Sequence, residues 1–362
     1  MNITSYNVTD VGYHYIGLRV LGGLPLADRA EQTRTVSRNV LKYARDKALR
    51  LMLPEPRGSF ETVGEKVCQE LVHFGFAHLV HNQGYELTEA GKSALDLLNT
   101  KEHMDLRRAM VRAHVRAYEN LRNVLAKHIA VDSIFSPIVE TPRVGATDYL
   151  VNLLSPTFGG EAETELASVL NALETRTAKK LEDALRQRVL RQTLKTATLS
   201  VPLFRSMCDR LVSLRLLNIM KATIEGCEFA RSYSPCVLTC PPRDWYHRLD
   251  VDLGSGATYV IYLSEPDMQE AQMQQRLLHS LGEAFSQLTP QAGYFDLPGV
   301  RDFVCEKLRI PEASFDEGIN VLLDRQPCPL TTGLGYERIT GRRKPLVRTR
   351  DSVQVFNLIR RA

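Results

Sequence analysis

Apolar residues along most of the chain recur every three or four positions, which predicts amphipathic helices, and short alternating stretches between them predict strands. In the N-terminal part, this pattern predicts helices over 36–53 and 60–74, separated by a break that contains proline and glycine. Strands over 77–80 and 85–88 follow and pair around a polar turn, and another helix begins at Thr88. The predicted order is therefore helix, break, helix and hairpin.

The middle of the chain is predicted to be mainly helical. One long helix is expected over 102–129, and a charged helical stretch over 162–194 follows a connector over 135–160 that contains proline and glycine. Ser200 is expected to cap a further helix over 201–214, because its hydroxyl can accept a hydrogen bond from a free amide of the first turn.

Two hairpins are predicted after this helix. Residues 219–224 and 227–237 are extended on either side of a short turn. The segment 247–263 alternates and turns at Gly254-Ser255-Gly256, which predicts a second hairpin. A helix over 268–288 then leads into the C-terminal part.

The C-terminal part repeats the order of the N-terminal part. The predicted elements are helices over 299–308 and 315–324 and strands over 335–339 and 346–348. Pro298 opens the first helix, where its missing amide is tolerated, and Ser314 is expected to cap the second. The same order of elements thus occurs at both ends of the chain.

Two motifs of the N-terminal part carry a resemblance to a known family. They are Glu70-Leu71-Val72-His73-Phe74-Gly75-Phe76 and Tyr85-Glu86-Leu87-Thr88-Glu89-Ala90-Gly91-Lys92. This stretch resembles the winged-helix family, as found in multiple-antibiotic-resistance-type and PadR-type repressors. The resemblance implies two helices followed by a hairpin called the wing, and it implies an activity in binding nucleic acid or protein.

We therefore expect an α+β fold that is mostly α, with two or three winged-helix domains joined by long helices. With 362 residues, the chain is long enough for this number of domains. The expected divisions are an N-terminal winged helix over 1–100, a helical middle region over 101–198, a second winged helix over 199–290 and a C-terminal winged helix over 291–362.

Composition favours a folded protein of a reducing compartment. The seven cysteines are odd in number and irregularly spaced, which argues against a disulfide framework. The N-terminus lacks the pattern of a signal peptide, and no apolar run is long enough to cross a bilayer. We expect a cytoplasmic protein without membrane contact.

The densest group of cations is expected on the C-terminal wing. Its members are Arg338, Arg342, Arg343, Lys344, Arg348 and Arg350. Burial of unpaired charge costs several kcal/mol, so this group must face solvent or a polyanion. We expect it to contact phosphates of DNA, and a solvated loop without a partner is the alternative.

The net charge of +4 is modest, so the location of the cations matters more than their number. Most of the 46 basic residues are Arg, which suits phosphates, although a GC-rich genome produces the same bias. Arg108, Arg112 and Arg116 lie at four-residue spacing on one face of the predicted helix over 102–129. We expect them to form a second DNA-binding surface, with a solvated face as the alternative.

The second helices of the N- and C-terminal parts are less suited to reading bases. Their acidic residues are Glu61, Glu65, Glu70, Asp316, Glu317 and Asp324. These carboxylates disfavour entry into an acidic groove, so DNA contact is expected mainly with the phosphate backbone. For the N-terminal unit, docking to protein is the favoured interpretation.

We find no catalytic group in the sequence, and we expect no metal and no cofactor. The glycine turn at 254–256 is followed by a β-branched, aromatic run instead of a helix, unlike a nucleotide-binding turn. A zinc site would have to use Cys227, Cys236, Cys240 and His247, whose spacing lacks the Cys-x-x-Cys knuckle. Trp245 is expected to hold a loop against the core and not to stack on bases.

Together these features predict a non-enzymatic DNA-binding subunit of a larger bacterial assembly. The architecture resembles replication initiators and the kleisin and winged-helix accessory subunits of chromosome-organising machines, some of which act against plasmids and phage. The resemblance implies protein partners that supply ATPase or nuclease activity. A protein-docking scaffold, a free-standing transcriptional regulator and an unrecognised metal enzyme remain as alternatives.

Overall fold

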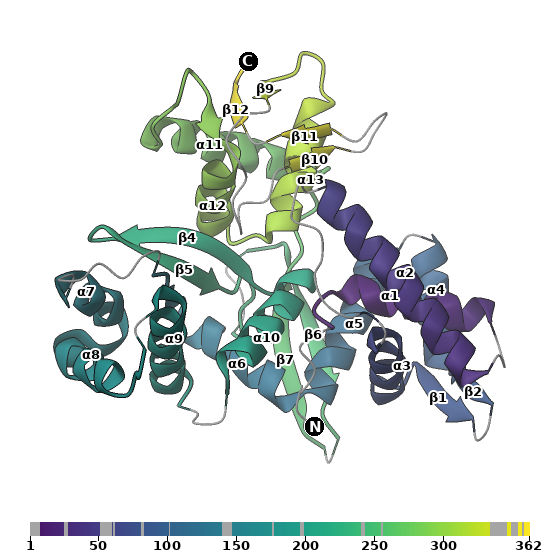
Figure 1. The fold of residues 1–362 in the computed structure, drawn as a ribbon. Helices are drawn as coiled ribbons and strands as arrows, with labels where there is room; N and C mark the ends of the chain where they lie inside the picture. The colour runs from purple at the N-terminus through teal and green to yellow at the C-terminus, as the bar shows by residue number, and fades with distance from the viewer. Residues whose placement is uncertain are drawn as a thin grey trace.

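The structure is a computed structural model. It describes residues 8–24, 28–50, 60, 62–80, 83–100, 102–139, 147–175, 177–195, 199–239, 243–254, 256–333, 346–348, 354–356 and 358–362. Helices predominate in these ranges, and the described strands pair in small antiparallel sheets (Figure 1). The predicted α+β class, mostly α, is confirmed. None of the helices in the described ranges is long and apolar enough to cross a membrane.

The N-terminal unit contains the predicted helices and hairpin. Its elements are α1 (Val11–Gly23), α2 (Arg29–Arg50), α3 (Val63–His73), β1 (Ala77–Val80), β2 (Gly84–Leu87) and α4 (Glu89–Thr100). The sequence analysis assigned no element to α1, which Asp10 caps by accepting a hydrogen bond from the Gly12 amide. Gly17 of α1 packs so closely against α3 that an added Cβ would lie 2.8 Å from Leu71 and Val67. The unit therefore has one more packed helix than the sequence predicted.

The predicted single helix over 102–129 is wrong, because the chain breaks at Tyr118. Two helices, α5 (His103–Ala117) and α6 (Glu119–Ala130), flank this residue. Tyr118 has an extended backbone, and its buried ring packs edge-on against Phe74, with 5.8 Å between the ring centroids. The break places this aromatic side chain in the core.

The middle region also contains elements that the sequence analysis missed. The predicted connector holds β3 (Ile134–Pro137) and α7 (Thr147–Phe158), and a short turn, η1 (Gly159–Glu161), follows. The predicted helical stretch over 162–194 is two helices, α8 (Ala162–Asn171) and α9 (Ala178–Leu194).

The helix after Ser200 and the following hairpins are confirmed. They are α10 (Val201–Ser213), the pair β4 (Asn218–Ile224) and β5 (Cys227–Tyr233), and the pair β6 (Tyr246–Asp252) and β7 (Thr258–Ser264). The Ser200 side chain accepts a hydrogen bond from the Leu203 amide, as expected of a helix cap. β3 pairs with β5, so the predicted boundary between 198 and 199 separates two strands of one sheet.

In its described residues, the C-terminal unit has three helices and two small sheets. Its elements are α11 (Ala271–Gln287), β8 (Phe295–Asp296), α12 (Leu297–Leu308), α13 (Glu312–Leu323), β9 (Leu330–Gly333), β10 (Leu346–Arg348), β11 (Gln354–Phe356) and β12 (Leu358–Arg361). The predicted Ser314 cap is wrong: Pro311 has the extended backbone of the cap position, and Ser314 is buried inside α13. The predicted partner of β10, residues 335–339, lies outside the described residues, and the structure pairs β10 with β11.

The middle and C-terminal units share one arrangement. In the middle unit, α6 is followed by β3, then by the inserted elements α7, η1 and α8, and then by α9, α10, β4 and β5; the strand order is β3-β5-β4. In the C-terminal unit, β8, α12, α13, β9 and β12 follow α11, and the strand order is β8-β12-β9. In both units the last strand lies between the other two. Residues 334–357 connect the last two strands of the C-terminal sheet and include β10 and β11.

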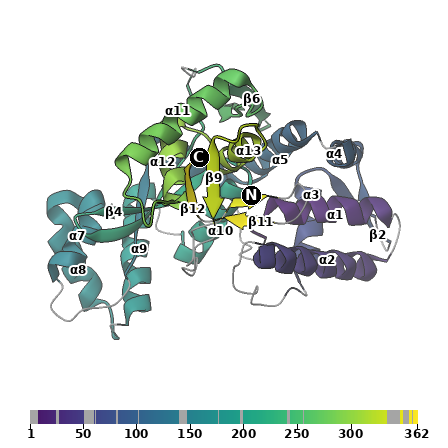
Figure 2. The same ribbon diagram turned by 90° about the horizontal axis from the view of Figure 1, so that it is seen from above.

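The hydrophobic core joins the units. The largest group of buried apolar side chains combines α1 and α3 with α10 and the β6–β7 hairpin. A second group fills the C-terminal unit, and a third lies between α7, α8, α9 and β5. Figure 2 shows α1 and α2 on one side and α7, α8 and α9 on the other, with the C-terminal helices between them.

Gly64 marks the closest approach of α2 and α3. A Cβ at this position would lie 2.0 Å from the Thr33 carbonyl oxygen. We expect Gly64→Ala to force the two helices apart and to lower the free energy of unfolding by about 1–3 kcal/mol, the usual cost of overpacking. Urea unfolding followed by circular dichroism measures this change.

Gly282→Ala provides the control, because Gly282 is exposed within α11 and nothing lies within 4 Å of its added Cβ. This variant should be as stable as the wild type or slightly more stable, because alanine favours helices more than glycine. Equal stability of both variants would contradict the close α2–α3 packing.

Candidate nucleic-acid interface

Most of the predicted C-terminal wing lies outside the described residues. This applies to Arg338, Arg342, Arg343, Lys344 and Arg350. Arg348 is the last residue of β10 and pairs with Gln354 of β11. The structure therefore describes β9, which precedes these residues, and the paired strands β10 and β11.

One residue of the predicted row on α5 is bound by a buried carboxylate, and the other two are exposed. Arg108 donates hydrogen bonds of 3.0 Å and 2.6 Å, from Nε and Nη2, to Oε2 of the buried Glu265. Arg116 donates from Nη2 to the Phe74 carbonyl oxygen at 2.8 Å. Arg112 is exposed. A buried carboxylate thus binds one of the three guanidinium groups, that of Arg108, whereas Arg116 is exposed like Arg112 and its contact with a carbonyl oxygen leaves its charge uncompensated.

The partner of Arg108 belongs to a buried ion cluster. Arg107 Nη1 donates to Glu265 Oε1 at 2.9 Å, and its Nε donates to the Leu214 carbonyl oxygen at 3.1 Å. Burial lowers the pKa of Arg107, whereas the hydrogen bonds to Glu265 raise the pKa of Arg108. The cluster joins α5 to the ends of α10 and β7. Arg108 therefore has a structural role that its spacing in the sequence did not indicate.

A second buried ion cluster joins α3 of the N-terminal unit to α10 of the middle unit. Arg210 of α10 donates from Nη1 to Glu70 Oε2 at 2.9 Å and from Nη2 to Glu70 Oε1 at 2.7 Å. His14 Nε2 of α1 lies 2.7 Å from Glu70 Oε2. All three side chains are buried. Burial raises the pKa of the Glu70 carboxyl, but the hydrogen bond from His14 and the charge of Arg210 outweigh it and hold this pKa far below its usual value.

These contacts turn α3 and α10 toward each other. The exposed residues of α3, α10 and α13 are Gln69, His73, Pro202, Arg205, Asp209 and Glu317. Arg205 lies within ion-pair distance of Glu182 and Asp183 on α9. The accessible faces of these helices therefore offer few cations to a nucleic acid, in keeping with the acidic pattern in the sequence.

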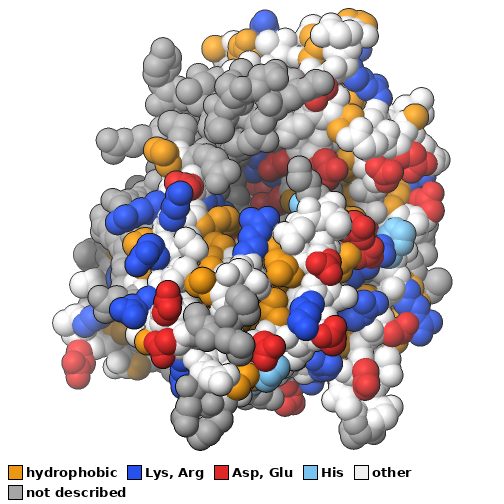
Figure 3. Space-filling view, turned by 90° about the vertical axis from the view of Figure 1, so that its right-hand side faces the viewer, with side chains coloured by type: hydrophobic (Ala, Val, Ile, Leu, Met, Phe, Trp, Pro, Cys, Tyr) orange, Lys and Arg blue, Asp and Glu red, His pale blue; other side chains and the backbone are white. Residues whose placement is uncertain are grey.

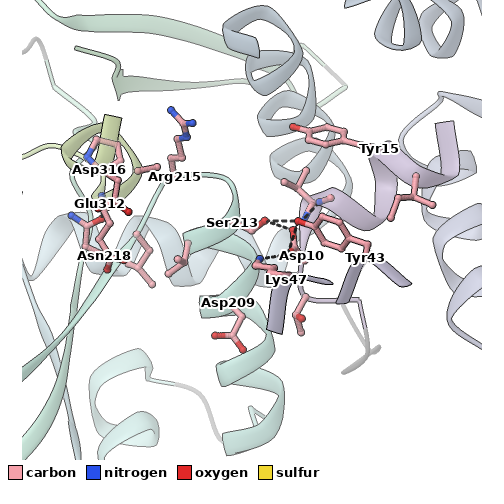
Figure 4. Close-up of a pocket in the computed structure, with 18 of the residues that line it drawn as sticks. Asp10, Tyr15, Tyr43, Lys47, Asp209, Ser213, Arg215, Asn218, Glu312 and Asp316 are labelled. Carbon is pink, nitrogen blue, oxygen red and sulfur yellow. Dashed lines mark hydrogen bonds and ion pairs between the residues drawn. The ribbon is translucent and has the colours of Figure 1, made fainter. Parts of the chain in front are cut away.

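A cleft of 670 Å³ lies between α1, α2, α10 and α13. Figure 4 shows Glu312 and Asp316 on one wall and Tyr43 and Lys47 on the other. Lys47 pairs with Asp10, which also accepts a hydrogen bond of 3.1 Å from the Ser213 hydroxyl. The cleft carries both signs of charge, and within the described ranges no group of three His, Cys, Asp or Glu side chains could hold a metal ion.

The predicted zinc candidates are dispersed. Cys227 and Cys236 are buried in different apolar groups, and burial raises the pKa of both thiols. Cys240 lies outside the described residues, and His247 is exposed on β6. Trp245 is buried in the C-terminal core between the guanidinium groups of Arg243 and Arg276, so the predicted core role is confirmed.

α2 carries a row of exposed cations that was not predicted from the sequence. The row consists of Arg34, Arg38, Lys42 and Arg45. The four residues are spaced by four, four and three positions, which places them on one helix face. The available signal was the stretch between Glu31 and Asp46, which contains these four basic residues and no acidic residue.

Comparisons with protein-family models, curated proteins and solved structures found no match for this chain.

The Glu70 cluster makes a specific prediction for the dependence of stability on pH. The pKa of the Glu70 carboxyl is lower in the folded state than in the unfolded state, where it is ~4.3. The ionised carboxylate therefore contributes its full stabilisation above the unfolded pKa, and this contribution is lost as the pH falls from there through the folded pKa. We expect Glu70→Gln to lower the free energy of unfolding at neutral pH by about 3–5 kcal/mol, because Arg210 stays buried without its carboxylate. The variant should lose less additional stability than the wild type on acidification.

Urea unfolding at neutral and acidic pH measures both effects. Glu89→Gln is the matched control, because Glu89 pairs with Lys92 on the exposed surface of α4. This control should keep the stability of the wild type and its dependence on pH. A Glu70→Gln protein with the acid profile of the wild type would contradict the ionised state of Glu70.

Proposed function

We propose that the chain is a non-enzymatic protein built of winged-helix units that binds DNA mainly through the phosphate backbone. One observation carries the proposal. The middle and C-terminal units share the order helix, strand, helix, helix, strand, strand, with the last strand at the centre of the sheet, once the insertions are set aside: α7, η1 and α8 follow the first strand of the middle unit, and β10 and β11 lie between the last two strands of the C-terminal unit. The N-terminal unit, whose sequence resembles winged helices, has three helices, α1, α2 and α3, followed by a hairpin.

The positions of α3, α10 and α13 favour contact with the DNA backbone over recognition of bases. Sequence-specific recognition requires side chains that reach base edges in a groove. The Glu70–Arg210 pair turns α3 and α10 toward each other inside the chain. Glu317, the exposed residue of α13 in the described range, is acidic. Contacts with phosphates need no such reading helix.

The basic C-terminal segment supports the same function. Four cations lie in the sequence between β9 and β10: Arg338, Arg342, Arg343 and Lys344. In a winged helix, the wing is the segment between the last two strands of the sheet, which is the place of these cations in the sequence. Six cations between 338 and 350 allow up to six phosphate contacts, which correspond to a salt slope of roughly −5.

We further propose that the protein works as a subunit of a bacterial assembly for DNA maintenance or for defence against plasmids or phage. The support is the multi-winged-helix architecture, which resembles accessory subunits of chromosome-organising machines. Its partners would supply ATPase or nuclease activity. Native mass spectrometry of the protein purified from its own host should show a complex with at least one other chain, and a lone monomer or homodimer would contradict this part of the proposal.

A protein-docking scaffold is the second candidate. The specific observation in its favour is that α3 and α10, the second helices of two units, already dock to each other through a buried ion pair. Such a scaffold would not bind DNA, so the experiment below separates the two functions.

We expect the wild-type protein to bind a duplex of random sequence, with an affinity that falls steeply as salt rises. Arg342→Glu/Arg343→Glu should weaken binding and reduce the magnitude of the salt slope by roughly 2, at about 0.9 per lost phosphate contact. Fluorescence anisotropy over a series of salt concentrations measures both quantities.

Lys179→Glu/Lys180→Glu is the matched control, because it makes the same change in net charge on an exposed part of α9. The control should bind like the wild type. Absence of wild-type binding at low salt would refute the DNA-binding function and favour the scaffold. Selection of one consensus from random sites would contradict the proposed lack of base reading.

A further inference from the structure

The exposed face of α2 carries a continuous row of cations. Arg34, Arg38, Lys42 and Arg45 are exposed, and the one other exposed residue between them is Asn39. From the first to the last of the four, the row extends about 16 Å along the helix axis, at 1.5 Å per residue. The row is therefore straight, polar and free of exposed apolar side chains.

The opposite face of α2 fixes the direction of this row. Val36 and Val40 are fully buried in the core of the N-terminal unit. The Gln32 amide accepts a hydrogen bond from the Tyr85 amide at 2.7 Å and donates to the Tyr85 carbonyl oxygen at 2.8 Å. Because these contacts hold the helix against the hairpin and the core, the cations cannot turn inward.

The central cations of the row have no acidic partner among the described residues, in contrast with their neighbours on the same helix. Arg29, before the row, pairs with Glu65, and Lys47, after the row, pairs with Asp10. Arg34 donates from Nε to the Ala30 carbonyl oxygen, which leaves its charge uncompensated. For Arg38 and Lys42, the described part of the chain offers no ion pair.

The C-terminal end of α2 lies next to two strands of the C-terminal unit. Figures 1 and 2 both show the C-terminal end of α2 beside β10 and β11. Basic side chains gather on one side of the face seen in Figure 3, and acidic ones surround the hollow next to them. The row thus leads toward β10 and β11.

We propose that Arg34, Arg38 and Lys42 bind the phosphate backbone of double-stranded DNA. This inference rests on the proposed DNA-binding function. A duplex is a rigid, linear polyanion with one charge per about 1.7 Å of its axis, so a rigid, straight row of cations can meet several phosphates at once.

The composition of the row favours a duplex over other polyanions. Binding of single strands uses exposed aromatic side chains on which bases stack, and the exposed residues between Arg34 and Arg45 include none. Insertion into a membrane surface needs several apolar side chains among the cations, whereas the large exposed apolar side chain of α2 in the described residues, Leu49, lies beyond the row.

The test compares the wild-type chain with Arg34→Ala/Arg38→Ala/Lys42→Ala, in which alanine preserves the helix. The probe is a duplex of random sequence, and anisotropy is measured over a series of salt concentrations. We expect an affinity lower by on the order of tenfold or more and a salt slope smaller in magnitude by roughly 2.7, at about 0.9 for each of three contacts.

Lys179→Ala/Lys180→Ala/Arg191→Ala is the matched control, because it removes three exposed cations from α9. Thermal unfolding should show that both variants are folded. The inference is supported if only the α2 variant loses affinity and slope.

Three other outcomes would contradict either this inference alone or the inference together with the proposed function. If the α2 variant binds like the wild type, the inference is wrong and the proposed function stands. An equal loss in the α9 control would also refute it, because general charge would then explain the binding. If the wild-type protein does not bind the duplex, both the inference and the proposed function are wrong.

Discussion

The buried pair between Glu70 and Arg210 is the interaction on which the arrangement of the units depends. It connects α3 of the N-terminal unit with α10 of the middle unit through two parallel hydrogen bonds, and His14 adds a third contact to the same carboxylate. An unpaired charge at this depth would cost several kcal/mol, so the two helices are stable in this position only together. The shared hydrophobic core of the two units has the same consequence.

This constraint decides which surfaces remain for a partner. With α3 and α10 facing each other, the outer faces of the molecule come from other elements, including α2. A second buried cluster, in which Arg107 and Arg108 share Glu265, fixes α5 against the β6–β7 hairpin in the same way. Cations inside these clusters stabilise the fold, whereas Arg34, Arg38 and Lys42 of α2 lie on an exposed face and contact phosphates in the function that we propose.

The sequence predicted those elements that depend on local patterns. The hairpins β4–β5 and β6–β7 and the Ser200 cap follow from alternation, turn residues and a hydroxyl before a helix, and the structure contains all of them. The break at Tyr118 was missed, because a helical apolar pattern continues through it and the Tyr118 ring packs against side chains distant in the sequence, those of Phe74 and Arg210. The strand β3 was missed for a similar reason, since its partner β5 lies almost a hundred positions later in the chain (Ile134 pairs with Ser232).

The two rows of basic residues, on α5 and on α2, show most clearly what a sequence alone leaves open. Spacing alone placed Arg108, Arg112 and Arg116 on one helix face, and the same rule places Arg34, Arg38 and Lys42 on another. The sequence determined which residues share a face, because helical geometry is local. Only the tertiary structure decided which face meets a carboxylate: Glu265 comes from a strand far along the chain and neutralises Arg108, whereas no described acidic side chain reaches Arg38. Charge compensation depends on distance in space, and a sequence states only distance along the chain.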